Sequence, residues 1–172
     1  NMARCFSGTV LFEGTTLSEG RGTTKSLEIV GAPDLDFDCL LKRMKVLAAP
    51  WLAGCVIRQC CFEPTFHKHA GKMCHGIQIH TDCSCYDHLA FRPYRLAALL
   101  LKAVRLEYPE YEIWRMFEYE YEKDRLAIDL LSGGTFLRQW VDDVQALPGD
   151  FDKRLHQDEQ AWKELRKPFL CY

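Results

Sequence analysis

A glycine-rich polar stretch near the start of the chain constrains the fold more than any other segment. Residues 12–23 contain three glycines, two glutamates, one arginine and four hydroxyl residues, and they follow the apolar run of residues 10–12. The apolar run predicts a short strand. Glycine permits a positive φ and lets a ligand approach the backbone closely. The sequence therefore predicts a loop at a strand end that is suited to polar contacts.

Arg21 lies between Gly20 and Gly22, so no bulky neighbour crowds its guanidinium. A guanidinium presented in this way suits a bidentate grip on a carboxylate or a phosphate. The plainer interpretation is a surface turn in which Glu19 and Arg21 pair with each other, because glycine-rich turns are common. Both interpretations stay open on the sequence alone.

The composition bounds the class of protein. A chain of 172 residues with 48% hydrophobic content can bury one core and suits one domain. The net charge is -2 and no block of five or more like charges occurs, so nucleic acid has no electrostatic support as a partner. No apolar run approaches the roughly 18 residues that a membrane helix needs. We therefore expect neither a membrane span nor a signal peptide.

Periodicity and chain breakers predict an α+β (or α/β) domain with a small mixed sheet covered by three or four helices. The expected helices are an N-capped helix over residues 37–47, a helix from Pro93 that Tyr108 and Pro109 stop, a helix over residues 135–144, and a helix from about Asp152. Asp34 and Asp36 are the candidate caps of the first. The expected strands are a buried one over residues 55–62, one over residues 76–81, and an extended segment over residues 117–122, with a short helical or extended piece over residues 126–131.

The strand expected over residues 76–81 alternates in character. Ile77 and Ile79 fall on one face, and Gln78 and His80 fall on the other. Such a strand presents two hydrogen-bonding side chains side by side. They could contact a ligand, or they could form a polar sheet face packed under a helix.

Nine cysteines are present, and an odd number cannot all pair within one chain. Their spacing shows no regular framework, so we expect reduced, buried thiols that act as small apolar residues, which favours a reducing compartment. A cysteine–histidine nucleophile would require Cys60, Cys61 or Cys74 beside a histidine, and no local signature supports one.

Histidine and cysteine are concentrated in residues 67–88, which raises the possibility of a zinc site. The members are His67, His69, Cys74, His75, His80, Cys83, Cys85 and His88. Structural zinc sites commonly use two ligand pairs with two or more residues between the partners, whereas the one close pair of cysteines here, Cys83 and Cys85, has a single residue between them. We expect no metal and no cofactor, and a zinc- or thiol-dependent binding module stays as an alternative function.

Several stretches resemble, in order, the motifs of one bacterial family that was long known only as a domain of unknown function. They are residues 12–23, 30–33, 64–71, 74–80 and 128–133, and residues 165–172 are similar to the C-terminal end of the family. The characterised members are exo-acting β-N-acetylmuramidases of peptidoglycan turnover. The resemblance covers nearly the whole chain, although residues 83–88 depart from the family pattern.

The resemblance implies that residues 1–172 form a single C-terminal domain of a two-part protein, whose Rossmann-like N-terminal half is absent from this chain. It implies a part in a glycoside hydrolase that releases terminal N-acetylmuramic acid from peptidoglycan fragments. This domain would form one wall of the active cleft, and the other half would supply a catalytic glutamate. The expected partners are a peptidoglycan-derived sugar and the missing half, and the isolated chain is expected to be inactive. Both a cytoplasmic and an exported bacterial location fit.

The same resemblance directs the choice of site residues. Glycosidases commonly use two carboxyl groups, and Glu13 and Glu19 are the loop candidates, with Glu19 as the fallback acid. N-acetylmuramic acid carries a lactyl carboxylate, for which Arg21 is the natural cation. The remaining predicted substrate-binding residues are Ser18, Thr23, Gln78 and His80. A non-catalytic carbohydrate-binding domain is a further alternative.

Overall fold

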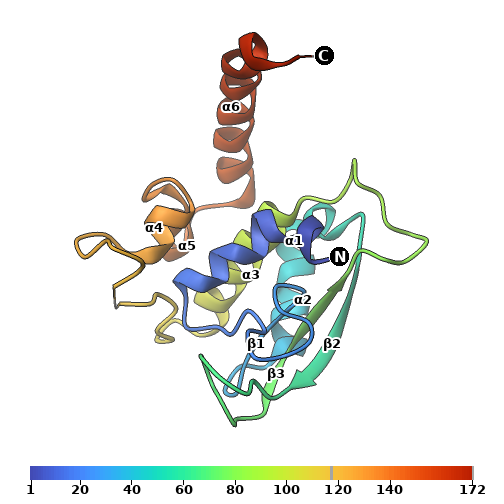
Figure 1. Cartoon of the computed structure of the whole chain (residues 1–172), viewed down its shortest axis with the longest axis vertical. Coiled ribbons are helices and arrows are strands. Elements are labelled where there is room, and N and C mark those ends of the chain that lie inside the picture. Colours follow the sequence, from blue (N-terminus) through green and yellow to red (C-terminus); the bar gives the residue numbers. More distant parts are fainter. Residues whose placement is uncertain (117, 172) are drawn as a thin grey trace.

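A computed structural model describes residues 1–116 and 118–171 and confirms the α+β class (Figure 1). The sheet consists of β1 (Ile29–Ala32), β2 (Val56–Phe62) and β3 (Cys74–His80), in the order β1-β3-β2. Both β1 and β2 run antiparallel to the central β3, so the pairing within this sheet is antiparallel and not mixed.

One helix organises the rest of the molecule. α3 (Pro93–Glu107) packs against α1, α2 and α5, and all of its residues from 95 to 104 are buried. The other helices are α1 (Met2–Thr9), α2 (Phe37–Ala48), α4 (Ala127–Leu131), α5 (Phe136–Asp142) and α6 (Pro148–Arg166), with short 3-10 turns η1 (Val10–Gly14), η2 (Ala49–Leu52) and η3 (Lys167–Phe169). No helix in the described part of the chain has the length and apolar character needed to cross a membrane.

The prediction of a strand over residues 10–12 is wrong. These residues belong to the 3-10 turn η1, which continues directly from α1. Leu11 and Phe12 are buried, so the apolar run does enter the core, but a short apolar run does not by itself distinguish a strand from a helix. The glycine-rich stretch therefore follows a helical turn.

The two longer strands lie where the sequence predicts them. In β3, Ile77 and Ile79 are fully buried while Gln78 and His80 are half-buried, which confirms the predicted alternation. β2 is an edge strand with Arg58 exposed, and it is not the buried strand that its apolar character suggested. Along its other long side β2 pairs with no described strand, because it lies at the end of the order β1-β3-β2.

Of the two predicted caps of α2, Asp36 is confirmed and Asp34 is not. The Asp36 carboxylate accepts from the backbone N–H of Asp38 at 2.8 Å and so caps α2. The extended segment expected over residues 117–122 is replaced by a tight turn in which Tyr119 and Glu122 bridge, and Phe117 lies outside the described residues.

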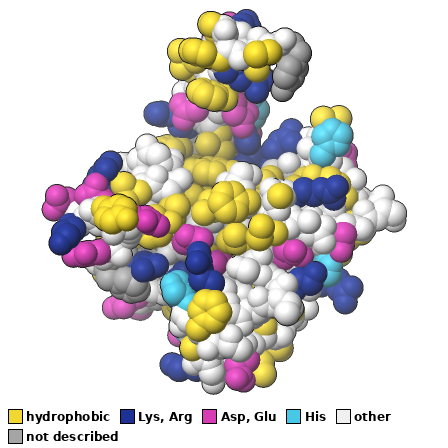
Figure 2. Space-filling model, in the orientation of Figure 1, with side chains coloured by type: hydrophobic (Ala, Val, Ile, Leu, Met, Phe, Trp, Pro, Cys, Tyr) yellow, Lys and Arg dark blue, Asp and Glu magenta, His cyan; other side chains and the backbone are white. Residues whose placement is uncertain are grey.

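α6 begins earlier than predicted and leaves the body of the molecule (Figure 1). Its first turns are anchored, because Phe151 is fully buried with its ring centroid 4.4 Å from that of Trp140. Farther along, Trp162 is 62% exposed and Leu165 is 67% exposed. Figure 2 shows hydrophobic side chains gathered at this far end. Of the predicted heptad positions, Leu155 packs against the core and Trp162 and Phe169 do not.

Candidate functional site

The glycine-rich loop owes its shape to two positive φ angles on either side of Arg21. Gly20 has a φ of +78° and Gly22 a φ of +85°. A Cβ on Gly22 would lie 2.8 Å from the backbone nitrogens of Thr65 and Phe66. The carbonyl of Gly22 accepts from the Thr65 N–H at 3.1 Å, which clamps the loop to residues 65–66. Both the backbone conformation and the close approach require glycine here.

Arg21 bridges the two glutamates of the loop. Its Nη2 donates to Glu13 Oε1 at 2.6 Å, and its Nε donates to Glu19 Oε1 at 3.1 Å. The side chain remains 44% exposed. The internal Glu19–Arg21 pair is therefore present, and Glu13 joins it. The guanidinium is not an unpaired cation waiting for a ligand.

Glu19 is a buried anion. It is 0% exposed, and Lys68 Nζ donates to its Oε2 at 2.8 Å. Burial alone would raise the pKa of Glu19, but the charge and hydrogen bond of Lys68, together with hydrogen bonds from the backbone and from Arg21, outweigh it and hold this pKa below its ordinary value. Glu19 is consequently ionised near neutral pH and has no proton to donate.

Lys68 fixes the glycine-rich loop through hydrogen bonds to three of its residues. Besides Glu19, its ammonium donates to the carbonyls of Phe12 at 2.7 Å and Leu17 at 2.9 Å. A ring nitrogen of His69 lies 2.9 Å from the carbonyl of Thr16. One short segment thus supplies several fixed contacts to the glycine-rich loop.

The backbone of this segment is unusual. His67 has a φ of +72° and His69 a φ of +57°, a region that residues other than glycine rarely adopt. These two residues flank Lys68, whose side chain is largely buried. Residues 64–71 were identified as a motif from the sequence. Nothing in the motif predicted that Lys68, between the two histidines, contacts the glycine-rich loop.

Tyr119 completes the surroundings of Glu13. Its hydroxyl donates to Glu13 Oε2 at 2.9 Å. Burial, together with the neighbouring Glu13, raises the pKa of Tyr119 to about 12, so the phenol stays protonated and acts as a donor. Tyr119 belongs to residues 117–122, which predicted an extended segment and not a contribution to this site.

These side chains surround a polar pocket of about 260 Å³. Its lining residues are Glu13, Arg21, His67, Arg115, Tyr119 and Glu120. Burial lowers the pKa of His67, more than the nearby Glu19 raises it, so the ring is neutral near pH 7. The pocket therefore offers carboxylate acceptors, guanidinium and phenol donors, and a neutral imidazole, which is a set suited to hydroxyl-rich and amide-bearing ligands.

The other predicted site residues have different places. Ser18 and Thr23 shape the loop, since Ser18 Oγ accepts from the Gly20 N–H at 3.2 Å and Thr23 Oγ1 donates to the Gly20 carbonyl at 2.7 Å. Gln78 and His80 lie on β3 and do not line the pocket. His80 Nδ1 instead faces Asp82 Oδ1 at 3.8 Å.

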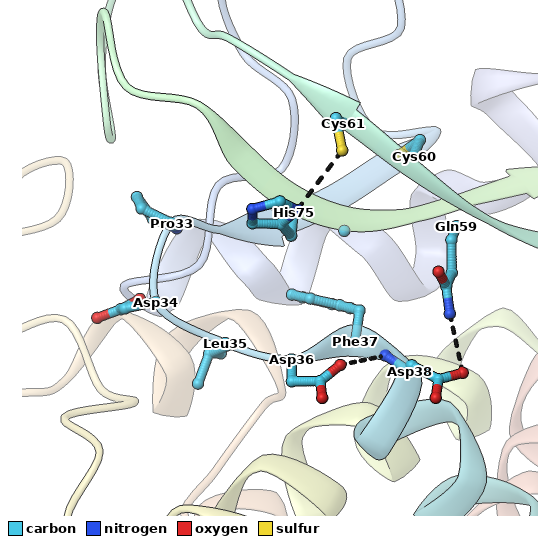
Figure 3. A pocket seen from close by; sticks show the side chains of 11 residues that line it. Pro33, Asp34, Leu35, Asp36, Phe37, Asp38, Gln59, Cys60, Cys61 and His75 are labelled. Carbon is cyan, nitrogen blue, oxygen red and sulfur yellow. Dashed lines mark hydrogen bonds between the residues drawn. The ribbon is translucent and has the colours of Figure 1, made fainter.

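A larger cavity of about 680 Å³ lies elsewhere, between the β1–α2 connection and strands β2 and β3 (Figure 3). At its rim the exposed thiol of Cys61 lies 3.5 Å from His75 Nδ1. Cys61 is thus not the buried thiol that the composition predicted, and it does have a histidine neighbour. The polar groups across the cavity serve the fold, because Asp36 caps α2 and Asp38 accepts from Gln59 Nε2 at 3.1 Å.

All nine cysteines are free thiols, but the predicted burial is confirmed only for Cys5 and Cys74. It is wrong for the exposed Cys61, Cys85 and Cys171. Within residues 1–116 and 118–171, no set of three or more histidine, cysteine, aspartate or glutamate side chains is arranged to hold a metal ion. The density of such residues along the sequence thus does not become a cluster of ligands in space.

The chain matches known proteins along nearly its whole length. The model of the family described as exo-β-N-acetylmuramidase NamZ, C-terminal, matches residues 4–172. The chain is 31% identical over 170 residues to the peptidoglycan β-N-acetylmuramidase NamZ of Bacillus subtilis (strain 168), an alignment that covers 97% of this chain and 36% of that protein. It therefore spans about a third of the length of this relative.

Two solved structures of DUF1343 family proteins from Bacteroides fragilis NCTC 9343 share the fold. The first has a TM-score of 0.74 at 17% identity, and the match covers 99% of this chain and 42% of the Bacteroides chain. The second has a TM-score of 0.61 at 21% identity, and the match covers 98% of this chain and 40% of the Bacteroides chain.

Proposed function

Because the chain belongs to the family of C-terminal domains of NamZ exo-β-N-acetylmuramidases, we propose that it is part of a glycoside hydrolase that releases terminal N-acetylmuramic acid from peptidoglycan fragments. The pocket around Arg21 would be its contribution to the substrate cleft. The observation that supports this role is the convergence of Glu13, Arg21 and Tyr119 on one open polar pocket.

The size of the pocket favours one wall of a cleft over a complete site. Small-molecule sites commonly enclose about 300–1,000 Å³ and bury most of their ligand. The pocket here holds about 260 Å³. A sugar seated in it would leave much of its surface uncovered, so a second wall would have to come from another part of a longer protein.

Glu13 is one of the two carboxylates that line this pocket, and Glu120 is the other. Each of the Glu13 oxygens accepts one hydrogen bond, from Arg21 and from Tyr119, and a carboxylate has about four acceptor positions. Glu13 could therefore accept further hydrogen bonds from sugar hydroxyls or from an acetamido N–H. Arg21 keeps its exposed N–H groups for the lactyl carboxylate, and its two glutamate partners fix the direction of the guanidinium.

Glu19 fits a positioning role better than that of a general acid. A general acid needs a proton at the working pH and therefore a raised pKa. Glu19 is held ionised by Lys68 and Arg21 and is fully buried. Its task would be to orient Arg21 at the pocket rim, and the proton donor would belong to the other wall.

The proposal can be tested on the 172-residue chain by titration with N-acetylmuramic acid and with N-acetylglucosamine, which lacks the lactyl group, while amide chemical shifts are followed. We expect larger shifts with N-acetylmuramic acid at residues 19–23, 67 and 119. Arg21→Lys should remove the preference between the two sugars, because an ammonium loses the bidentate geometry. Arg58→Lys on the exposed edge of β2 is the matched control and should leave it unchanged.

A parallel assay with a chromogenic N-acetylmuramide examines catalysis. The chain alone should give little or no hydrolysis. Hydrolysis that disappears in Glu19→Gln would instead make Glu19 the acid and overturn the division of roles. Equal shifts with both sugars, unaffected by Arg21→Lys, would remove the support for a muramic acid subsite.

A further inference from the structure

Two cysteine thiols meet in the connection between β3 and α3. The Cys85 thiol donates a hydrogen bond to Cys83, with the two sulfurs 2.7 Å apart. Both residues are free, and Cys85 is exposed while Cys83 is half-buried. The contact is closer than that of ordinary non-bonded sulfur atoms, so the path to a covalent S–S bond is short.

A tight turn brings the two sulfurs together. The N–H of Tyr86 donates to the carbonyl of Cys83 at 3.1 Å, which closes a turn with Ser84 and Cys85 at its centre. The turn is held on the body of the molecule. The guanidinium of Arg4 lies 4.3 Å from the centroid of the Tyr86 ring, and the N–H of Asp87 donates to the Gly54 carbonyl at 3.0 Å.

Among the other described cysteines none is both exposed and hydrogen-bonded to a second thiol. Cys55 lies near Cys83 and Cys85, but it is half-buried, and burial raises its pKa to about 12. Cys5 and Cys74 are buried, and burial raises the pKa of each to about 11. Cys60 is half-buried, and burial likewise raises its pKa to about 11. Cys61 is exposed, but the partner at its sulfur is the His75 ring.

We propose that Cys83 and Cys85 form a redox-active dithiol that closes reversibly to a disulfide. This site is independent of the sugar pocket. The oxidant would be a low-molecular-weight disulfide such as oxidised glutathione, and a thiol of the same class would reopen the bond.

The exchange is balanced in two steps. The Cys83 thiolate attacks one sulfur of the oxidant, forms a mixed disulfide and releases one thiolate. The Cys85 sulfur, after it has lost its proton to water, attacks Cys83 and expels the second thiolate. The protein loses two protons and two electrons, and one molecule of oxidant becomes two molecules of thiol.

Intact-mass measurement of the full chain, equilibrated with oxidised and reduced glutathione at a series of ratios, tests the proposal. We expect the loss of two hydrogen atoms, with a single peptide that contains both Cys83 and Cys85 in cross-linked form. Dithiothreitol should reverse the change completely. Cys83→Ser and Cys85→Ser should each abolish the loss of hydrogen and leave a stable glutathione adduct on the remaining thiol.

Cys61→Ser is the matched control and should leave the cross-link unchanged, because Cys61 lies on β2 with a histidine partner. Circular dichroism of each variant establishes that it is folded. Adducts at Cys61 and Cys171 with no cross-link at residues 83–85 would overturn the proposal. So would zinc that copurifies with the chain and protects both thiols from oxidation.

Discussion

Lys68 and Glu19 form a buried ion pair, with Nζ 2.8 Å from Oε2 and side-chain exposures of 10% and 1%. The pair joins two loops that lie far apart in the sequence. Removing two charges from water is costly unless each has a partner and further hydrogen bonds. Here Lys68 also donates to two carbonyls and Glu19 also accepts from Arg21, so both conditions are met.

Replacing Lys68 by methionine should destabilise the fold strongly, because the Glu19 carboxylate would stay buried without its main counter-charge. Loss of one partner of a buried pair typically costs about 3–5 kcal/mol. Lys25→Met provides the control, since the Lys25–Glu28 pair is 46% exposed on the lysine side and should contribute at most about 1 kcal/mol. Urea unfolding measures both. If the double variant Glu19→Gln with Lys68→Met were no more stable than Lys68→Met alone, the pair would not be the cause.

The stability of the fold should depend on Glu19 at acid pH. Its pKa is below the ordinary 4.5 in the folded chain, so the unfolded chain takes up a proton first as the pH falls. The contribution of Glu19 is therefore complete above about pH 5 and is lost as the pH falls through the lowered folded pKa. Urea midpoints between pH 7 and pH 3 should converge for the wild type and Glu19→Gln. Parallel curves over this range would contradict the prediction.

Gly22→Ala should lower the free energy of unfolding more than Gly71→Ala does. Both glycines have positive φ, +85° and +70°, so both substitutions carry the conformational cost of about 1–2 kcal/mol for an L residue. A Cβ at Gly71 meets nothing within 4 Å, whereas a Cβ at Gly22 meets backbone nitrogens at 2.8 Å. Overpacking of this kind adds about 1–3 kcal/mol. Equal losses in urea unfolding would show that the contact between residues 22 and 65–66 yields without cost.

Replacing Trp140 and replacing Trp162 by alanine should lower the stability of the fold by very different amounts. Trp140 is 4% exposed and packs against Phe151, so Trp140→Ala should cost about 3–5 kcal/mol. Trp162 on the outer part of α6 is 62% exposed, and Trp162→Ala should stay within about 0.5 kcal/mol of the wild type. Thermal unfolding of the two variants provides the comparison, and a large loss for Trp162→Ala would show that α6 is covered in solution.

The regular elements could be predicted where local chemistry decides them. Asp36 caps α2, Pro93 starts α3, and the alternation of Ile77 and Ile79 marks one face of β3. Residues 10–12 were mispredicted because a short apolar run suits either a buried strand or a buried helical turn. The edge position of β2 depends on the strand order, which the residues of one strand do not determine.

The candidate site was predictable in part for a similar reason. Glu13, Glu19 and Arg21 lie within nine residues of each other, and local spacing brings them together. Lys68 and Tyr119 reach the same place across tertiary contacts, and neither residue type in its local sequence indicates a buried ammonium or a phenol donor. Gln78 and His80 lie on the same face of β3, but neither lines the pocket. Alternation along a strand predicts which side chains share a face, and it does not predict which other parts of the chain pack near that face.

α6 divides the molecule into regions that open at different free energies. Arg95 grips it through Asp152 and Glu159, at 2.6 Å and 2.7 Å, and the residues from 160 to 166 are all exposed. A helical end of this length has little stability of its own, because helices need tertiary packing or greater length to persist in water. Its amides should exchange with deuterium through local fraying, while those of α3 await global unfolding. A denaturation midpoint therefore reports on the body of the domain and says little about the outer half of α6.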